Sequence, residues 1–344
     1  MVWNALMYAF LHRRNPFRTG RGCRRGEPDS PPVDTAGGEG FVPAEPPRRM
    51  HFRTFRAFFF TAVAAFAAHI APAQPTLLLR VDDVGMNHAV NMAMWEVAEA
   101  GLPFSTSVMF ACPWHEEAVA ILRQHPQASV GVHLTLNSEW KGYRWGPVAG
   151  RSRVPSLVDQ TGHFHPSVKG FLTSGFDLGE VEIELDAQVE RALASGLKID
   201  YVDYHMGTAV STPALRAIVE KLARKHGLGI SMYFNENRRT LFDIPPERKL
   251  SELLDVVEKM DPKRPNLVVL HLAKPFPEMQ ALVDMNTPIM TGAQGESLVA
   301  THRVAELAAV LSPEFRAKVG SRVRLGTYRG LIAETGLDRM AAPR

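Results

Sequence analysis

The 344-residue sequence predicts an α/β protein, a deformed (β/α) barrel of mainly parallel strands in a single domain after an N-terminal leader. From Thr76 onward, short apolar runs alternate with segments of helical periodicity, which is typical of βαβ units. About six or seven such units fit a closed or nearly closed barrel better than an open sheet. The composition, 45% hydrophobic and 22% charged, supplies a buried core, and two cysteines exclude a disulfide framework.

The leader covers residues 1–73 and has two parts. Residues 1–49 are rich in Gly, Pro and Arg, and we expect a disordered or misassigned extension there. Residues 50–73 read as a signal peptide: His51, Arg53 and Arg56 precede an apolar run that is too short to span a bilayer, and Ala71-Pro72-Ala73 resembles a cleavage site. We therefore expect an exported protein, periplasmic or extracellular, whose barrel domain occupies residues 74–344. A retained membrane anchor is the alternative.

Strands and helices follow in alternation. The first strand, 77–81, is a continuous apolar run of the kind that parallel sheets bury. Further strands are expected at 105–110, 130–136, 199–204, 229–234, 267–272 and 323–325. Helices are expected at 88–100, 116–124, 178–195, 213–226, 250–258, 301–311 and 328–333. Residues 137–176 should form an elaborated loop that covers one end of the sheet and carries Trp140, Tyr143 and Trp145.

The distribution of charge argues against a nucleic-acid partner. The chain has a net charge of +3, but its first 73 residues hold ten arginines and five acidic residues. The predicted barrel is therefore slightly acidic, whereas a nucleic-acid-binding domain carries excess positive charge.

Polar residues gather at one end of the predicted barrel. In a (β/α) barrel, the carboxyl ends of the strands face the active site. Four strands bring carboxylates or imidazoles to that end, namely Asp82 and Asp83, His133, Asp203 with His205, and His271. Each residue alone has an ordinary explanation, such as a helix cap or a hydrogen-bonded core histidine. Together they favour one site.

Two imidazoles and a carboxylate form a ligand set for a divalent metal ion that keeps positions open for water and substrate. Of the adjacent aspartates, one can bind the ion while the other reaches toward a bound water. Asp203 would support a ligand or be purely structural. Zn²⁺ and Mg²⁺ both fit, and the two imidazoles favour Zn²⁺ or another transition metal.

Several motifs resemble the YdjC-like carbohydrate deacetylases. They are V-D-D-V-G-M-N at 81–87, S-T-S-V-M at 105–109, G-V-H-L-T-L at 131–136, S-L-V-D-Q-T-G-H-F at 156–164 and Y-V-D-Y-H-M-G at 201–207. The resemblance continues more weakly through V-V-L-H-L at 268–272 and the segment that begins at Arg303. It implies a metal-dependent removal of acetyl groups from N-acetylated sugars such as chito-oligosaccharides.

Carried over by position, the resemblance makes Asp83, His133 and His205 the metal ligands. It makes Asp82 the catalytic base and His271 the general acid. Gly207 departs from the family pattern, which commonly has a second histidine there, and Tyr204 replaces a small residue. Both changes bear on the substrate wall.

With a sugar substrate, the aromatic residues of the long loop have two interpretations. Trp140, Tyr143 and Trp145 either stack on sugar rings or pack within the loop.

Two other functions stay open from the sequence. One is a metal-dependent phosphoesterase or other barrel hydrolase, although no cluster of Arg or Lys lies near the motifs. The other is an inactive carbohydrate-binding protein. The expected partner is an N-acetylated carbohydrate; no stable membrane span is expected once the leader is cleaved, and a homodimer is left open.

Overall fold

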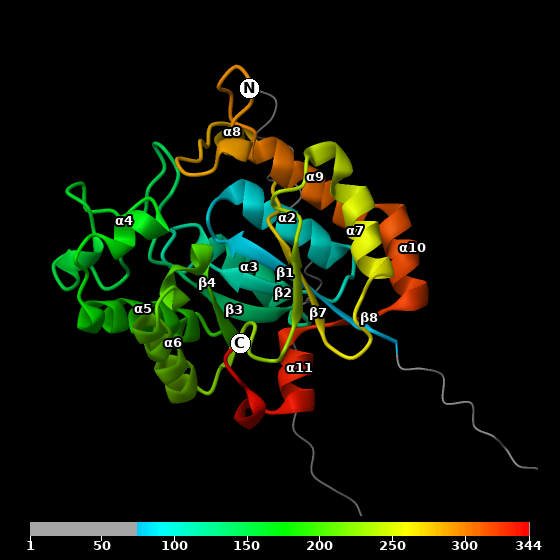
Figure 1. Ribbon diagram of the computed structural model, residues 1–344, viewed down its shortest axis with the longest axis horizontal. Coiled ribbons are helices and arrows are strands. Elements are labelled where there is room, and N and C mark those ends of the chain that lie inside the picture. The colour runs from blue at the N-terminus through cyan, green and yellow to red at the C-terminus, as the bar shows by residue number, and fades with distance from the viewer. Residues whose placement is uncertain (1–73, 344) are drawn as a thin grey trace, which may run out of the picture. The chain divides into compact units, whose positions relative to one another are not determined.

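The computed structural model describes residues 74–343, which form an α/β domain built on one parallel sheet (Figure 1). The predictions for residues 1–49 and 50–73 lie outside the described residues. The strands are β1 (Thr76–Val84), β2 (Ser105–Val108), β3 (Ser129–Leu134), β4 (Ile199–Tyr204), β5 (Gly229–Ile230), β6 (Asn237–Thr240), β7 (Asn266–Leu270) and β8 (Arg324–Gly326). Their order, β5-β4-β3-β2-β1-β7-β6, with β8 beside the start of β1, confirms the predicted parallel barrel class.

The helices are α2 (His88–Glu99), α3 (His115–Gln124), α4 (Val168–Leu172), α5 (Leu178–Ala194), α6 (Pro213–His226), α7 (Lys249–Glu258), α8 (Pro277–Gln280), α9 (Val299–Leu311), α10 (Pro313–Arg322) and α11 (Tyr328–Thr335). Helices α5 and α6 pack together on one flank of the sheet, and α7, α9 and α10 pack together on the other (Figure 1). Within residues 74–343, no helix is long and apolar enough to cross a bilayer.

The barrel is open at one seam. Within the described residues, no ladder joins β5 to β6, so the sheet is a half-barrel rather than a closed one. The predicted strand 229–234 ends early because Met232, at φ 72°, turns the chain away after β5. Strand β6 was not predicted because its N-R-R-T run has no apolar periodicity, and helix α10 was not predicted either.

Alternation along β1 separates a helix-packed face from the barrel interior. Leu77, Leu79 and Val81 belong to the large core cluster between sheet and helices, whereas Leu78 belongs to a small interior cluster. Arg80 and Asp82 follow Leu78 at intervals of two, so they share its interior face. The interior is thus apolar at the level of Leu78 and becomes polar toward the carboxyl ends of the strands.

A glycine on β3 makes room for this interior layer. Gly131 pairs with Tyr201 on β4, and a Cβ atom at Gly131 would lie 2.5 Å from the Tyr201 ring. The ring is fully buried and stacks on Tyr328 of α11 at a centroid distance of 4.3 Å. It cannot move aside without disturbing the end of the barrel that α11 covers.

We predict that Gly131→Ala lowers the free energy of unfolding by about 1–3 kcal/mol through overpacking against Tyr201. Gly320→Ala is the matched control, because Gly320 lies in α10 and a Cβ there would meet nothing within 4 Å. Urea denaturation of both variants measures the difference. Equal stability of the two would contradict this account of the barrel interior.

Candidate active site

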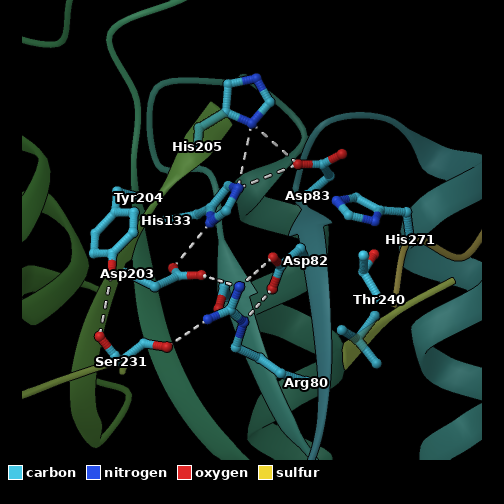
Figure 2. A network of polar contacts seen from close by, with 12 residues as sticks. Arg80, Asp82, Asp83, His133, Asp203, Tyr204, His205, Ser231, Thr240 and His271 are labelled. Carbon is cyan, nitrogen blue, oxygen red and sulfur yellow. Dashed lines mark hydrogen bonds and ion pairs between the residues drawn. The ribbon is translucent and has the colours of Figure 1, made fainter. Parts of the chain in front are cut away.

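The candidate site lies at the carboxyl ends of β1, β3, β4 and β7. It opens into a cavity of about 660 Å³ whose lining includes Asp82, Asp83, His133, His205 and His271. The five residues expected to be metal ligands or catalytic groups therefore line the same cavity, whereas Asp203 is outside its lining. Figure 2 shows His133 and His205 on one side of Asp83 and His271 on the other.

A bulge at the end of β1 directs both aspartates to this cavity. The register of β1 against β2 shifts between Val81 and Val84, and Asp83 has a positive φ of 62°. In a regular strand, neighbouring side chains point to opposite faces, so Asp83 would point away from the side that Asp82 occupies. The bulge re-aims it. Such strained backbone is found most often at functional sites.

Three side chains converge on a point where a metal ion fits. Asp83 Oδ1 lies 3.3 Å from His133 Nε2 and 3.3 Å from His205 Nδ1, and the two nitrogens are 3.3 Å apart. Tetrahedral ligands at about 2.1 Å from one ion are about 3.4 Å apart. Asp83 Oδ1 is buried and has no hydrogen-bond partner among the described residues. The donor set and its spacing fit a divalent ion.

Each imidazole is held by a carboxylate on its other nitrogen. His133 Nδ1 lies 2.8 Å from Asp203 Oδ1, and His205 Nε2 lies 2.9 Å from Glu139 Oε2. Such contacts fix the tautomer, so that the nitrogen facing Asp83 keeps its lone pair for a metal. Sequence reasoning left Asp203 open between supporting and structural roles, and it missed Glu139 altogether.

The carboxylates govern how these groups ionise. Burial opposes charge on His133, but Asp203 and Asp83 outweigh it and raise the pKa of His133 well above its usual value. Burial likewise opposes charge on His205, but Glu139 and Asp83 raise its pKa to about 9. Burial disfavours ionised Asp83, yet Arg303 and the two histidines hold its pKa well below the ordinary value. In their neutral form the two imidazoles offer lone pairs to a metal, so binding of a metal must displace the protons that these carboxylates favour.

Asp82 pairs with Arg80 and is not one of the three side chains that converge around Asp83 Oδ1. The guanidinium donates from Nε and Nη2 to the two oxygens of Asp82 at 2.7 and 2.6 Å, and Nη2 lies 3.1 Å from Asp203 Oδ2. A carboxylate oxygen of Asp82 lies within 4.8 Å of His133 and of Asp203. Asp82, His133 and Asp203 thus form a second possible metal group, in which Arg80 already pairs with both carboxylates. Figure 2 shows this chain of contacts below Asp83.

His271 directly follows β7, and one of its ring nitrogens lacks a hydrogen-bond partner among the described residues. Its Nδ1 is buried without a partner among the described residues, and its backbone N–H donates to Glu306 Oε2 at 2.8 Å. Burial is the main cause that lowers its pKa to about 4, while Asp83 acts in the opposite direction. The imidazole is therefore neutral at neutral pH.

The aromatic rings of the long loop serve mostly as packing. Trp140 is 3% exposed and Trp145 is 5% exposed. Their indole N–H groups donate to Met86 Sδ and to the carbonyl of Asn137, respectively. Trp140 also lines the cavity. This burial favours the loop-packing alternative for Trp145.

The neutral state of His271 makes a testable contribution to stability. Its pKa in the unfolded chain is about 6.5, so folding disfavours proton uptake there. The resulting stabilisation is complete above pH 6.5 and is lost as the pH falls toward 4. Each unit by which folding lowers a pKa is worth about 1.4 kcal/mol, and because the residue as a whole is only partly buried, the expected effect is on the order of 1–2 kcal/mol.

We predict that His271→Asn flattens the acid limb of stability. Urea unfolding of metal-free protein at pH 7 and pH 4.5 should show a smaller loss for the variant than for the parent chain. Other titrating groups are common to both proteins and cancel in the difference. Parallel pH profiles would show that His271 is not held neutral by the fold.

Comparisons with known proteins agree on one family. The sequence model of the YdjC-like protein family matches residues 76–320. The chain is 31% identical to a carbohydrate deacetylase of Thermus thermophilus, over 61% of this chain and 82% of that protein. It is 33% identical to a carbohydrate deacetylase of Brevibacillus brevis, over 44% of this chain and 56% of that one. The match thus spans little more than half the length of the latter relative.

A solved structure has the same fold. It is described as a candidate cellobiose-phosphate cleavage protein of Enterococcus faecalis, and it matches with a TM-score of 0.57 at 25% identity. The alignment covers 75% of this chain and 99% of the other.

Proposed function

Because the chain belongs to the YdjC-like protein family, we propose that it is a metal-dependent hydrolase that removes acetyl groups from N-acetylated sugars or oligosaccharides. One observation carries this proposal. Asp83 Oδ1, His133 Nε2 and His205 Nδ1 form a triangle with sides of 3.3 Å, and all three residues line one cavity. The carbohydrate deacetylases named above support the substrate class.

Asp83, His133 and His205 would hold the ion. When bound, a divalent metal lowers the pKa of water and polarises a carbonyl, which together are worth several kcal/mol. Asp203 and Glu139 would orient the two imidazoles for this task. Metal analysis of the purified protein distinguishes Zn²⁺, Mg²⁺ and other divalent metals.

Asp82 is the proposed general base. Arg80 occupies one side of each carboxylate oxygen and fixes the orientation of the group, and each oxygen retains a second lone pair. Asp82 takes a proton from the attacking water while the water oxygen bonds to the acetyl carbon. A positioned base contributes typically about 10²–10⁴-fold.

His271 is the proposed general acid. When water adds, the π electron pair of the acetyl carbonyl moves to the carbonyl oxygen. That pair then re-forms the C=O bond, the C–N bond breaks, and the electrons of the C–N bond go to nitrogen. His271 supplies the proton that this nitrogen needs, and the products are acetate and the free amine. Because burial lowers its pKa to about 4, His271 must gain its proton during turnover, and the negative charge that develops in the cavity favours that gain.

The two aspartates provide the sharpest test. Asp83→Ala should abolish binding of the metal. Asp82→Asn should leave the metal bound and lower kcat for acetate release by about 10²-fold or more, because only the base is lost. Metal content and acetate release from N-acetylglucosamine oligomers, with and without a chelator, measure both effects. Near-normal turnover of Asp82→Asn would refute the assignment of the base.

The same assay separates the other functions. Phosphate release from sugar phosphates without acetate release would favour the phosphoesterase alternative. Saturable binding of the oligomers without release of either product would identify a carbohydrate-binding protein that has lost turnover.

We also propose that the protein is exported. Mass spectrometry of full-length chain produced in a secreting host should find Gln74 at the N-terminus of the mature protein. Recovery of residues 50–73 on membrane-associated protein would support the anchor instead.

A further inference from the structure

Arg303 is a buried cation whose two terminal nitrogens have different surroundings. It lies on α9, is 5% exposed, and donates from Nη2 to Asp83 Oδ2 at 2.6 Å. Its Nη1 is buried and has no hydrogen-bond partner among residues 74–343. A buried unpaired donor costs about 1–3 kcal/mol, so its presence needs an explanation.

The guanidinium is held in place from two directions. Asp83 binds one edge of it, and its central carbon lies 5.4 Å from the centroid of the Trp140 ring, in a cation–π arrangement. Both partners line the cavity that Arg303 also lines. The cation is therefore fixed before any substrate arrives, as electrostatic stabilisation of a transition state requires.

Two other unpaired buried atoms border the same cavity. Asp83 Oδ1 is assigned to the metal ion and His271 Nδ1 to the leaving nitrogen under the function proposed above. Neither assignment uses the free N–H groups of Arg303. The reaction itself creates one further demand, because water addition places a full negative charge on the acyl oxygen.

We infer that Arg303 Nη1 donates a hydrogen bond to the acyl oxygen of the bound N-acetyl group and to the oxyanion that forms from it. This inference rests on the proposed deacetylase function. One guanidinium then performs two tasks: Nη2 leaves Asp83 with a single free oxygen for the metal, and Nη1 stabilises charge beside that metal. Removal of one donor to an oxyanion typically costs about 10²–10³-fold in kcat.

Arg303→Lys tests the inference because lysine keeps the charge and can pair with Asp83, but cannot serve two acceptors with a fixed fork. We expect its metal content and its affinity for Zn²⁺ alone to match the parent chain. We expect kcat for acetate release to fall by about 10²-fold and KM to change little, because the lost contact strengthens as the charge develops.

Arg144→Lys is the matched control. Arg144 pairs with Asp159 at 2.9 Å and has a buried unpaired Nε, but it lies outside the cavity lining. It should retain the parent kcat. A second variant, Arg303→Ala, should lose activity and regain part of the parent kcat when guanidinium ion is added. This rescue distinguishes a missing donor from a folding defect.

The outcomes separate the two proposals. If the parent chain releases no acetate while its metal is bound, the proposed function fails. If the parent is active and Arg303→Lys has the same kcat, or if its loss of activity follows loss of metal, Arg303 is only a positioning residue for Asp83 and the inference is wrong. Absence of guanidinium rescue in folded Arg303→Ala would overturn it as well.

Discussion

The site depends on keeping one buried carboxylate ionised. Asp83 is 1% exposed, and burial alone would favour its neutral form. Arg303 compensates at Oδ2, while His133 and His205 surround Oδ1 at 3.3 Å. Breaking a buried ion pair by removing one partner typically costs about 3–5 kcal/mol. The same group also carries a strained backbone, so the surrounding barrel must hold it in place.

The barrel supplies that support through its alternation. Apolar side chains on the outer face of β1 pack under the helices and fix the strand, while the inner face changes from Leu78 to Arg80 and Asp82 within a few residues. Polar groups can gather inside because their charges are paired: Asp203 is hydrogen-bonded to His133 and lies 3.1 Å from Arg80 in an ion pair, and Ser231 accepts a hydrogen bond from Arg80 at 2.6 Å. Such a connected network is stable where isolated buried charges are not.

The sequence predicted which strands carry the candidate site, because strand ends in a parallel barrel meet at one edge whatever their order. This principle brought Asp83, His133, His205 and His271 to one cavity without knowledge of the fold in detail. It did not predict the partners. Arg80 lies within an apolar run that indicated only a strand, and Glu139 lies in an irregular loop where no pattern marks a partner for His205. Arg303 is 220 residues from Asp83, and no local pattern marks that contact. Nor could periodicity indicate the open seam between β5 and β6. Beside that seam, the left-handed backbone of Met232 turns the chain away after β5.

Two adjacent ionised carboxylates would normally repel each other. Here each has its own arginine from a different part of the chain: Arg80 within β1 for Asp82, and Arg303 on α9 for Asp83. The pairings differ in a way that matters chemically. Arg80 binds both oxygens of Asp82 and so orients the whole group, whereas Arg303 binds a single oxygen of Asp83 and leaves the other facing two imidazoles. A base needs a fixed direction and an available lone pair, and a ligand needs one uncommitted oxygen. The division of labour that we propose for the two aspartates therefore follows from the geometry of their cations, because their own side chains are identical.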